Sequence, residues 1–98
     1  MKFFVAQRVQ KHLPEQEAMQ WFPKHGEYMQ YGVNQEIVLL AGPMPDADGG
    51  FTILRAESKE QAETFLAQDP MVCAGLQHYE VKEFIPLSKS PSVEKWCE

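Results

Sequence analysis

The order of its segments predicts that this chain folds as an α+β domain, with an antiparallel sheet and helices on one face of it. Four apolar segments with strand patterns lie at the start, in the middle and near the end of the chain. A helical pattern follows the first and the third of them. The 98 residues suffice for one core. Strand, helix, strand, strand, helix, strand is the ferredoxin-like βαββαβ order.

The composition indicates which classes of partner to exclude and in which cellular compartment the protein is expected. Fourteen acidic and nine basic residues give a formal charge of −5, so we expect no nucleic-acid partner and no membrane partner. The apolar run after Met1 is too short for a signal peptide. Cys73 and Cys97 form neither a disulfide framework nor a C-x-x-C pair. We therefore expect a cytoplasmic protein with free thiols.

The first strand is predicted over residues 2–9. Side chains alternate across a strand, so the apolar residues fall on both of its faces: Phe3, Val5 and Val9 on one, Phe4 and Ala6 on the other. Helices on one side of the sheet can cover only one of these faces. The other face needs a second subunit, which predicts a homodimer.

Two helical pieces are predicted between the first and second strands. Residues 14–20 form a helical turn, and Pro23 ends any continuous helix because proline lacks the N–H that a helix interior requires. The second piece begins at Pro23 and ends just before Gly32, which serves as its left-handed cap. His25 and Met29 share a face of this piece.

The middle of the chain is predicted to be a hairpin. Residues 37–41 form a continuous apolar run, and residues 51–57 alternate between two faces. The loop 43–50 between them is rich in proline, aspartate and glycine. Asp46 and Asp48 resemble the start of a calcium-binding loop, but phenylalanine stands where such a loop requires glycine. Two solvated turn aspartates are the better account.

The second helix of the predicted fold begins at a capping box and ends at a proline. Gln61 follows Ser58 by three residues, so each can bond a free backbone N–H of the first turn. Pro70 stops the helix. Its apolar stripe begins at Ala62 and reaches Asp69 seven residues later. Asp69 is therefore expected to point inward.

The last strand is predicted over residues 77–85 and completes a domain of residues 1–86. Residues 87–98 form a C-terminal tail of polar and charged residues. Trp96 is the one residue of this tail that indicates docking on a folded surface.

Four short motifs resemble those of the YciI-like family. In order, they are Pro23-Lys24-His25, Leu40-Ala41-Gly42-Pro43-Met44, Asp69-Pro70-Met71-Val72-Cys73-Ala74-Gly75-Leu76 and Val81-Lys82-Glu83-Phe84. The resemblance covers residues 1–86 and implies a dimeric α+β barrel, a fold shared with muconolactone-isomerase-like and monooxygenase-like proteins. It also implies an active site built on a histidine and an aspartate, which by position are His25 and Asp69. Two residues depart from the family pattern: Gly26, directly after the histidine, and Met71, where an aromatic residue is common. The resemblance therefore does not specify the shape of the substrate.

His25 and Asp69 are the candidate catalytic residues. Histidine suits proton transfer near neutral pH, and a merely hydrogen-bonded helix histidine is the alternative. An inward carboxylate must be paired or hydrogen-bonded, so Asp69 either orients His25 or accepts N–H bonds from the turn that follows it. Both helices pack on the same face of the sheet. The two side chains are therefore predicted to lie within hydrogen-bond reach.

A pocket for a small organic ligand is predicted around this pair. Cys73 lies near Asp69, but a cysteine with no histidine beside it is more often a buried structural residue than a nucleophile. His12 and His78 have no partner at metal-ligand spacing, and no phosphate-binding loop is present, so we expect no metal and no cofactor. The expected substrate-binding residues are Tyr28, Met29, Pro43, Asp46, Asp48 and Met71.

The function predicted from these residues is cofactor-independent proton transfer on a small organic substrate, as lyases and isomerases perform it. Related families favour a cyclic or aromatic-derived substrate. His25 would move the proton and Asp69 would orient it. The alternative is a non-catalytic ligand-binding or accessory dimeric protein in which the pair is structural.

Overall fold

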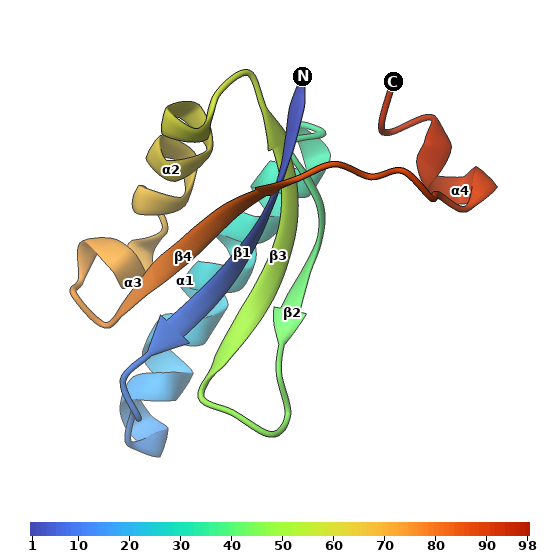
Figure 1. Cartoon of the computed structure of the whole chain (residues 1–98). Coiled ribbons are helices and arrows are strands. Elements are labelled where there is room, and N and C mark those ends of the chain that lie inside the picture. Colours follow the sequence, from blue (N-terminus) through green and yellow to red (C-terminus); the bar gives the residue numbers. More distant parts are fainter.

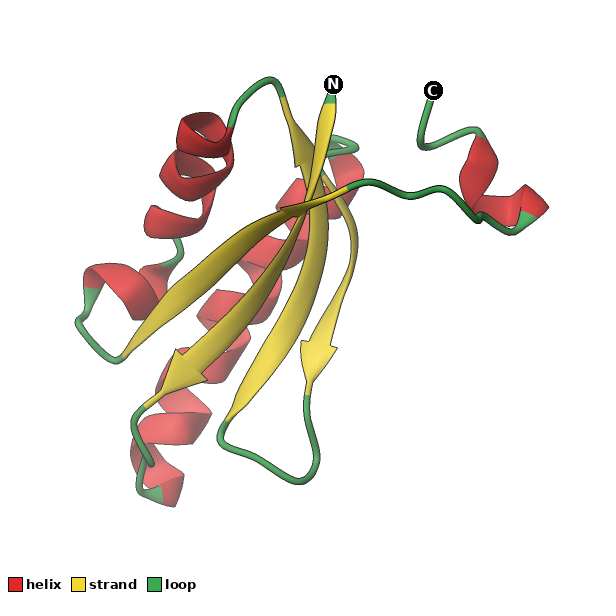
Figure 2. Cartoon of the chain, viewed as in Figure 1, coloured by secondary structure: helices red, strands yellow, loops and turns green.

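The computed structural model describes all 98 residues and shows a four-stranded antiparallel sheet with helices behind it (Figure 1). The strand order is β2-β3-β1-β4, and the central strand β1 pairs with both β3 and β4. The two longer helices cover the same face of the sheet (Figure 2), which confirms the predicted α+β, ferredoxin-like fold. The elements are β1 (Lys2–Gln10), α1 (Glu15–Asn34), β2 (Val38–Pro43), β3 (Gly49–Ala56), α2 (Lys59–Ala67), α3 (Pro70–Cys73), β4 (Gln77–Phe84) and α4 (Pro91–Glu94).

The core lies between the sheet and the two longer helices. Phe4 and Ala6 of β1 are fully buried toward the helices, whereas Phe3, Val5 and Val9 on the opposite face are only half-buried. The alternation predicted for the first strand is therefore confirmed. The buried apolar cluster consists of Phe4, Ala6, Val38, Leu54, Ala56, Ala62 and Leu66.

The helix α1 is continuous, so the predicted break at Pro23 is wrong. Pro23 lies inside the helix and leaves the carbonyl of Met19 without its usual N–H partner. Both residues are exposed, so water can bond that carbonyl. The cost of the missing bond is local, and the packing that buries Met29 and Gly32 stabilises the helix as a whole.

Gly32 is not the left-handed cap that the sequence predicted. It is buried in the last turns of α1, and a Cβ there would lie 2.6 Å from the Phe65 ring and 2.8 Å from Val38. The helix continues to Asn34, and the residue with a left-handed backbone is Glu36, at φ 60°. Gly32 therefore serves the close approach of α1 to its neighbours.

The hairpin is tighter than predicted. β2 extends to Pro43 and β3 begins at Gly49, which leaves only residues 44–48 outside the strands. Gly49 has φ 144°, and a Cβ on it would lie 2.1 Å from the carbonyl oxygen of Arg8. Glycine at this position lets the end of β3 lie directly against β1.

The cap of α2 is confirmed. The Ser58 hydroxyl accepts the N–H of Gln61 at 3.1 Å, and the Gln61 side chain accepts the N–H of Glu57 at 2.7 Å. The short helix α3 follows directly and was not predicted. Asp69 is its N-cap, and Pro70 stands at the first helical position, where its missing N–H costs nothing.

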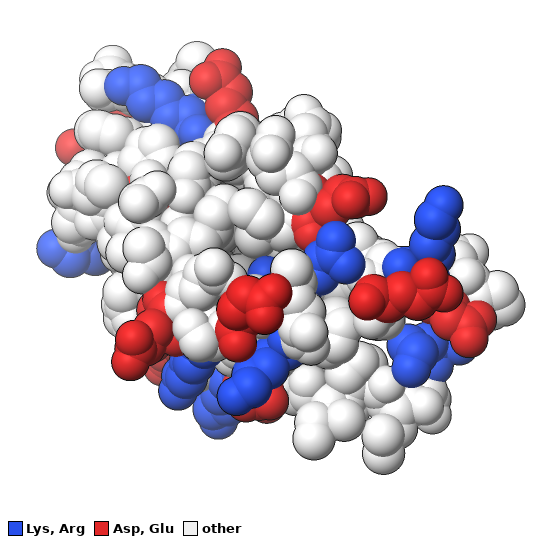
Figure 3. All heavy atoms as spheres, turned by 90° about the horizontal axis from the view of Figure 1, so that it is seen from above, with Lys and Arg blue, Asp and Glu red and all other residues white.

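The C-terminal tail docks on its own chain through Trp96. The indole ring lies 5.6 Å from the Phe3 ring and 5.0 Å from the guanidinium of Arg55, which also donates to the Trp96 carbonyl at 2.5 Å. The docking that Trp96 indicated is therefore present, on the sheet face opposite α1 and α2. None of the helices combines the length and the apolar character needed to cross a membrane. On the face seen in Figure 3, acidic and basic side chains lie interspersed.

Candidate functional site

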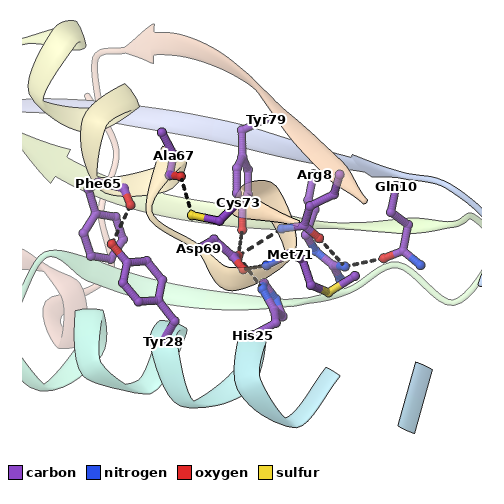
Figure 4. A network of polar contacts seen from close by, with 11 residues as sticks. Arg8, Gln10, His25, Tyr28, Phe65, Ala67, Asp69, Met71, Cys73 and Tyr79 are labelled. Carbon is purple, nitrogen blue, oxygen red and sulfur yellow. Dashed lines mark hydrogen bonds and ion pairs between the residues drawn. The ribbon is translucent and has the colours of Figure 1, made fainter. Parts of the chain in front are cut away.

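The centre of the candidate site is the carboxylate of Asp69, whose side chain is 0% exposed. One oxygen, Oδ1, accepts the backbone N–H of Met71 at 2.9 Å. The other, Oδ2, accepts from Gln77 Nε2 at 2.9 Å and from the Tyr79 hydroxyl at 2.8 Å. The same oxygen lies 2.5 Å from His25 Nδ1 (Figure 4). The helix α1, the turn into α3 and the strand β4 thus converge on one buried group.

The hydrogen bonds keep Asp69 ionised. Burial raises the pKa of its carboxyl, but the hydrogen bond and the charge of His25, together with bonds from Met71 and Tyr79, outweigh burial. The net pKa therefore lies below the ordinary value. Because an ionised carboxylate can only accept, Nδ1 of His25 must donate to it. In the neutral imidazole the lone pair is then on Nε2, which no group of the chain engages.

A second layer of polar residues surrounds this pair. Gln77 donates to Asp69 through Nε2, and its Oε1 accepts from Nη1 of Arg8 at 3.2 Å. The same Nη1 donates to the side-chain oxygen of Gln10. Burial and the nearby Asp69 charge both raise the pKa of Tyr79, so its hydroxyl stays a donor.

Sequence reasoning missed Arg8, Gln77 and Tyr79. One signal was available, because Arg8 has the same parity along the first strand as the buried Phe4 and Ala6. A charged residue at such a position must find a polar partner. The partner itself could not be inferred, because it depends on how β1 and β4 align.

A cavity of about 510 Å³ adjoins the pair, between α1 and the end of the hairpin. His25 lines it, and its side chain is 15% exposed, whereas Asp69 lies behind the imidazole. Because Nδ1 is held by Asp69, the ring edge that carries Nε2 is the one left to face this cavity. The lining residues are Arg8, Gln10, Phe22, His25, Gly26, Met29, Gln30, Val33, Ala41, Gly42, Pro43, Met44, Ala47, Asp48 and Gly49.

Three of the six expected substrate-binding residues line this cavity: Met29, Pro43 and Asp48. The structure places the other three elsewhere.

Tyr28 points toward α2, where its hydroxyl donates to the Phe65 carbonyl at 2.6 Å and its ring stacks on Phe65 at 4.9 Å. This burial, with the charge of Asp69, raises the pKa of Tyr28 to about 12. Met71 is fully buried and does not line the cavity, and its backbone N–H donates to Asp69. Asp46 is exposed in the hairpin turn and does not line the cavity.

The expectation that Cys73 is buried is wrong. Cys73 is exposed and Cys97 is half-buried, and both are free thiols. The one-turn helix α3 turns Cys73 outward, and its Sγ lies 3.4 Å from the carbonyl oxygen of Ala67. No group of three or more His, Cys, Asp and Glu side chains is arranged to hold a metal ion.

Comparison with protein families assigns the chain. The model of the YCII-related domain matches residues 1–85. The chain belongs to the YCII-related family. The resemblance carried by the sequence motifs is thereby confirmed.

Two solved structures are similar to this YCII-related chain. One is 5-chloro-2-hydroxyhydroquinone dehydrochlorinase from Burkholderia phenoliruptrix in complex with 2,5-dihydroxybenzoquinone. It has 22% identity and a TM-score of 0.69, and the match covers 85% of this chain and 93% of the other. The second is muconolactone isomerase, with 17% identity, a TM-score of 0.68 and 92% of each chain covered. These likenesses establish the fold. A search of curated proteins found no match to this chain.

Proposed function

We propose that this YCII-related protein catalyses cofactor-independent proton transfer on a small organic compound, with His25 as general base and acid. The observation that carries this proposal is the 2.5 Å contact of Nδ1 with the buried carboxylate of Asp69. It fixes the tautomer and leaves the lone pair of Nε2 for a compound in the cavity. Asp69 is the positioning residue of the pair.

The chemistry follows from this arrangement. Nε2 accepts a proton from a carbon next to a carbonyl group, and the electron pair of the broken C–H bond moves toward the carbonyl oxygen as an enolate. The Asp69 carboxylate stabilises the imidazolium that forms. Return of the proton to another carbon completes an isomerisation. If the electron pair instead expels a leaving group from the neighbouring carbon, the reaction is an elimination.

The similar structures support this class of reaction. Their names denote a dehydrochlorination and an isomerisation, and each of these reactions moves a proton. Both proteins share the fold that brings the face of α1 to this cavity. We therefore propose proton transfer as the reaction step for this chain. The volume of the cavity limits the size of the substrate.

We also propose that the protein acts as a homodimer formed through the sheet face opposite α1 and α2. Leu40, Phe51 and Phe84 are exposed, and in the sheet register each lies on that face. Exposed apolar side chains clustered on one face are typical of an interface. A second copy would cover the part of this face that the C-terminal tail leaves exposed.

Deuterium exchange tests the proposed reaction. We would incubate the protein in D₂O with muconolactone and with a panel of cyclic ketones and lactones, and follow loss of the C–H signals by NMR. We expect catalysed exchange that His25→Asn abolishes and that His78→Asn, at an exposed histidine on β4, retains. Circular dichroism checks that both variants fold. Compounds that bind in the cavity without any exchange would instead support the non-catalytic ligand-binding alternative.

A further inference from the structure

Arg8 is a buried cation without an anionic partner. Its side chain lies on the inner face of β1, opposite Tyr79 on one side and Gly50 on the other, and the residue is only 6% exposed. No carboxylate forms an ion pair with it. The groups that accept from it are the neutral amide oxygens of Gln10 and Gln77. Buried charges are normally paired, whereas the charge of Asp69 acts on this guanidinium only at a distance, with Gln77 between the two.

One edge of the guanidinium is free. Both glutamines bind Nη1, and no group of the chain accepts from Nε or Nη2. Nε and Nη2 form the planar two-donor edge with which arginine binds carboxylates. This edge lies over Gly50, where a Cβ would come within 2.7 Å of Nη2 and 3.0 Å of Nε. Glycine at this position therefore leaves room for the edge that carries the two free donors.

Arg8 and His25 line the same cavity. The cavity is large enough for one small molecule, and the glycines Gly42 and Gly49 form part of its wall. Asp48 is the one carboxylate in that wall. Asp48 belongs to the exposed hairpin turn, so its charge lies at the rim of the cavity. Its Oδ2 lies 3.6 Å from Nδ1 of His12, which pairs with it when protonated.

We propose that Arg8 is an anion subsite that binds the carboxylate of the substrate through Nε and Nη2. The substrate class is then a small organic carboxylic acid whose reacting carbon lies beside Nε2 of His25. This inference rests on the proposed function for the reaction, and on Arg8 alone for the binding. Arg8 holds one end of the molecule and His25 acts on the other.

Binding of a simple carboxylate tests the subsite without the unknown substrate. We would titrate the protein with benzoate, with benzamide as its neutral counterpart and with inorganic phosphate, by calorimetry at millimolar ligand. We expect saturable benzoate binding that Arg8→Gln weakens at least about tenfold, since a charge-assisted hydrogen bond contributes that much or more. Lys59→Gln, at an exposed cation in the first turn of α2, should leave benzoate binding unchanged.

A second measurement covers the case in which Arg8→Gln does not fold. In the wild-type protein the Nε–H resonance of Arg8 should shift on addition of benzoate and not on addition of benzamide. The subsite is overturned by absent benzoate binding, by equal binding of benzoate and benzamide, by phosphate binding as tightly as benzoate, or by an unmoved Nε–H resonance. His25→Asn should keep benzoate binding. Benzoate binding together with no exchange in muconolactone or in any of the ketones and lactones would therefore refute the proposed reaction and leave the subsite standing.

Discussion

Replacement of Asp69 by asparagine should both destabilise the fold and switch the tautomer of His25. The new amide can still accept the Met71 N–H at the position of Oδ1, but it places an NH₂ group where Oδ2 accepts from Gln77, Tyr79 and His25. Three hydrogen bonds at about 1 to 1.5 kcal/mol each amount to about 3 to 4.5 kcal/mol.

Part of this loss can be recovered. The Tyr79 hydroxyl can rotate, and His25 can move its proton to Nε2 so that Nδ1 accepts from the new amide. The Gln77 amide cannot turn over without losing its bond from Arg8. The Gln77 bond and the charge assistance of the other two bonds stay lost, so we expect Asp69→Asn to lower the free energy of unfolding by about 2 kcal/mol, or the melting temperature by about 10 °C for a domain of this size.

Urea unfolding at one fixed protein concentration measures the loss, with tryptophan fluorescence and circular dichroism as probes. Asp46→Asn, at an exposed carboxylate of the hairpin turn, should stay within about 0.5 kcal/mol of the wild type. Nitrogen-15 NMR of the imidazole should show the proton on Nδ1 in the wild type and on Nε2 in Asp69→Asn. A loss below about 1 kcal/mol, or an unchanged tautomer, would refute the reasoning that Asp69 orients the base.

Five further outcomes are expected from the structure. Burial raises the pKa of the Asp69 carboxyl, but its hydrogen bonds lower that pKa by more, so the folded-state value lies below the ordinary value of 3.8. The stability that ionised Asp69 contributes is therefore lost as the pH falls from 3.8 toward the folded-state pKa. Asp69→Asn should accordingly weaken the loss of unfolding free energy at acid pH. Gly26→Ala should stabilise α1 by about 0.5 to 1 kcal/mol, because a Cβ there meets nothing within 4 Å. Gly32→Ala should destabilise by about 1 to 3 kcal/mol in the same urea assay, because its methyl group would lie 2.6 Å from a ring carbon. Brief alkylation of the native protein should label the exposed Cys73 before the half-buried Cys97, and mass spectrometry showing the reverse order would contradict the placement of α3. Light scattering should give twice the 11.2 kDa of one chain, and a monomer at micromolar concentration would rule out the proposed dimer.

The sequence predicted the parts of the fold that depend on local periodicity. Two-residue alternation located the inner face of β1, and the Ser58 and Gln61 pair located the start of α2. The stripe predicted for the second helix placed Asp69 inward correctly, although α2 already ends at Ala67 and Asp69 is the N-cap of α3. The break at Pro23 was wrong because the cost of one missing hydrogen bond is local, while the packing of α1 on the sheet is not visible in the sequence. Gly32 was misread for the same reason, since its neighbours come from other elements.

The candidate site was predicted only in part because its polar residues meet through the sheet. Arg8 and Gln77 are far apart in the chain and become neighbours through the antiparallel register of β1 and β4. No local pattern specifies that register. His25 and Asp69 could be paired in advance because the two predicted helices must pack on one face of the sheet: His25 lies on the first, and Asp69 follows the end of the second.

The positions of the His25 base and of the Arg8 cation both depend on a glutamine at position 77. The Gln77 side chain donates to Asp69 through Nε2 and accepts from Arg8 through Oε1, so it needs a donor and an acceptor on one short planar group. Glutamate would set a second acceptor against the Asp69 carboxylate, and an apolar residue of similar size would leave both buried charges short of a hydrogen bond. Because Asp69 also fixes the His25 tautomer, a change at Gln77 should disturb base and cation together, whereas a change at Gln10 reaches the cation alone.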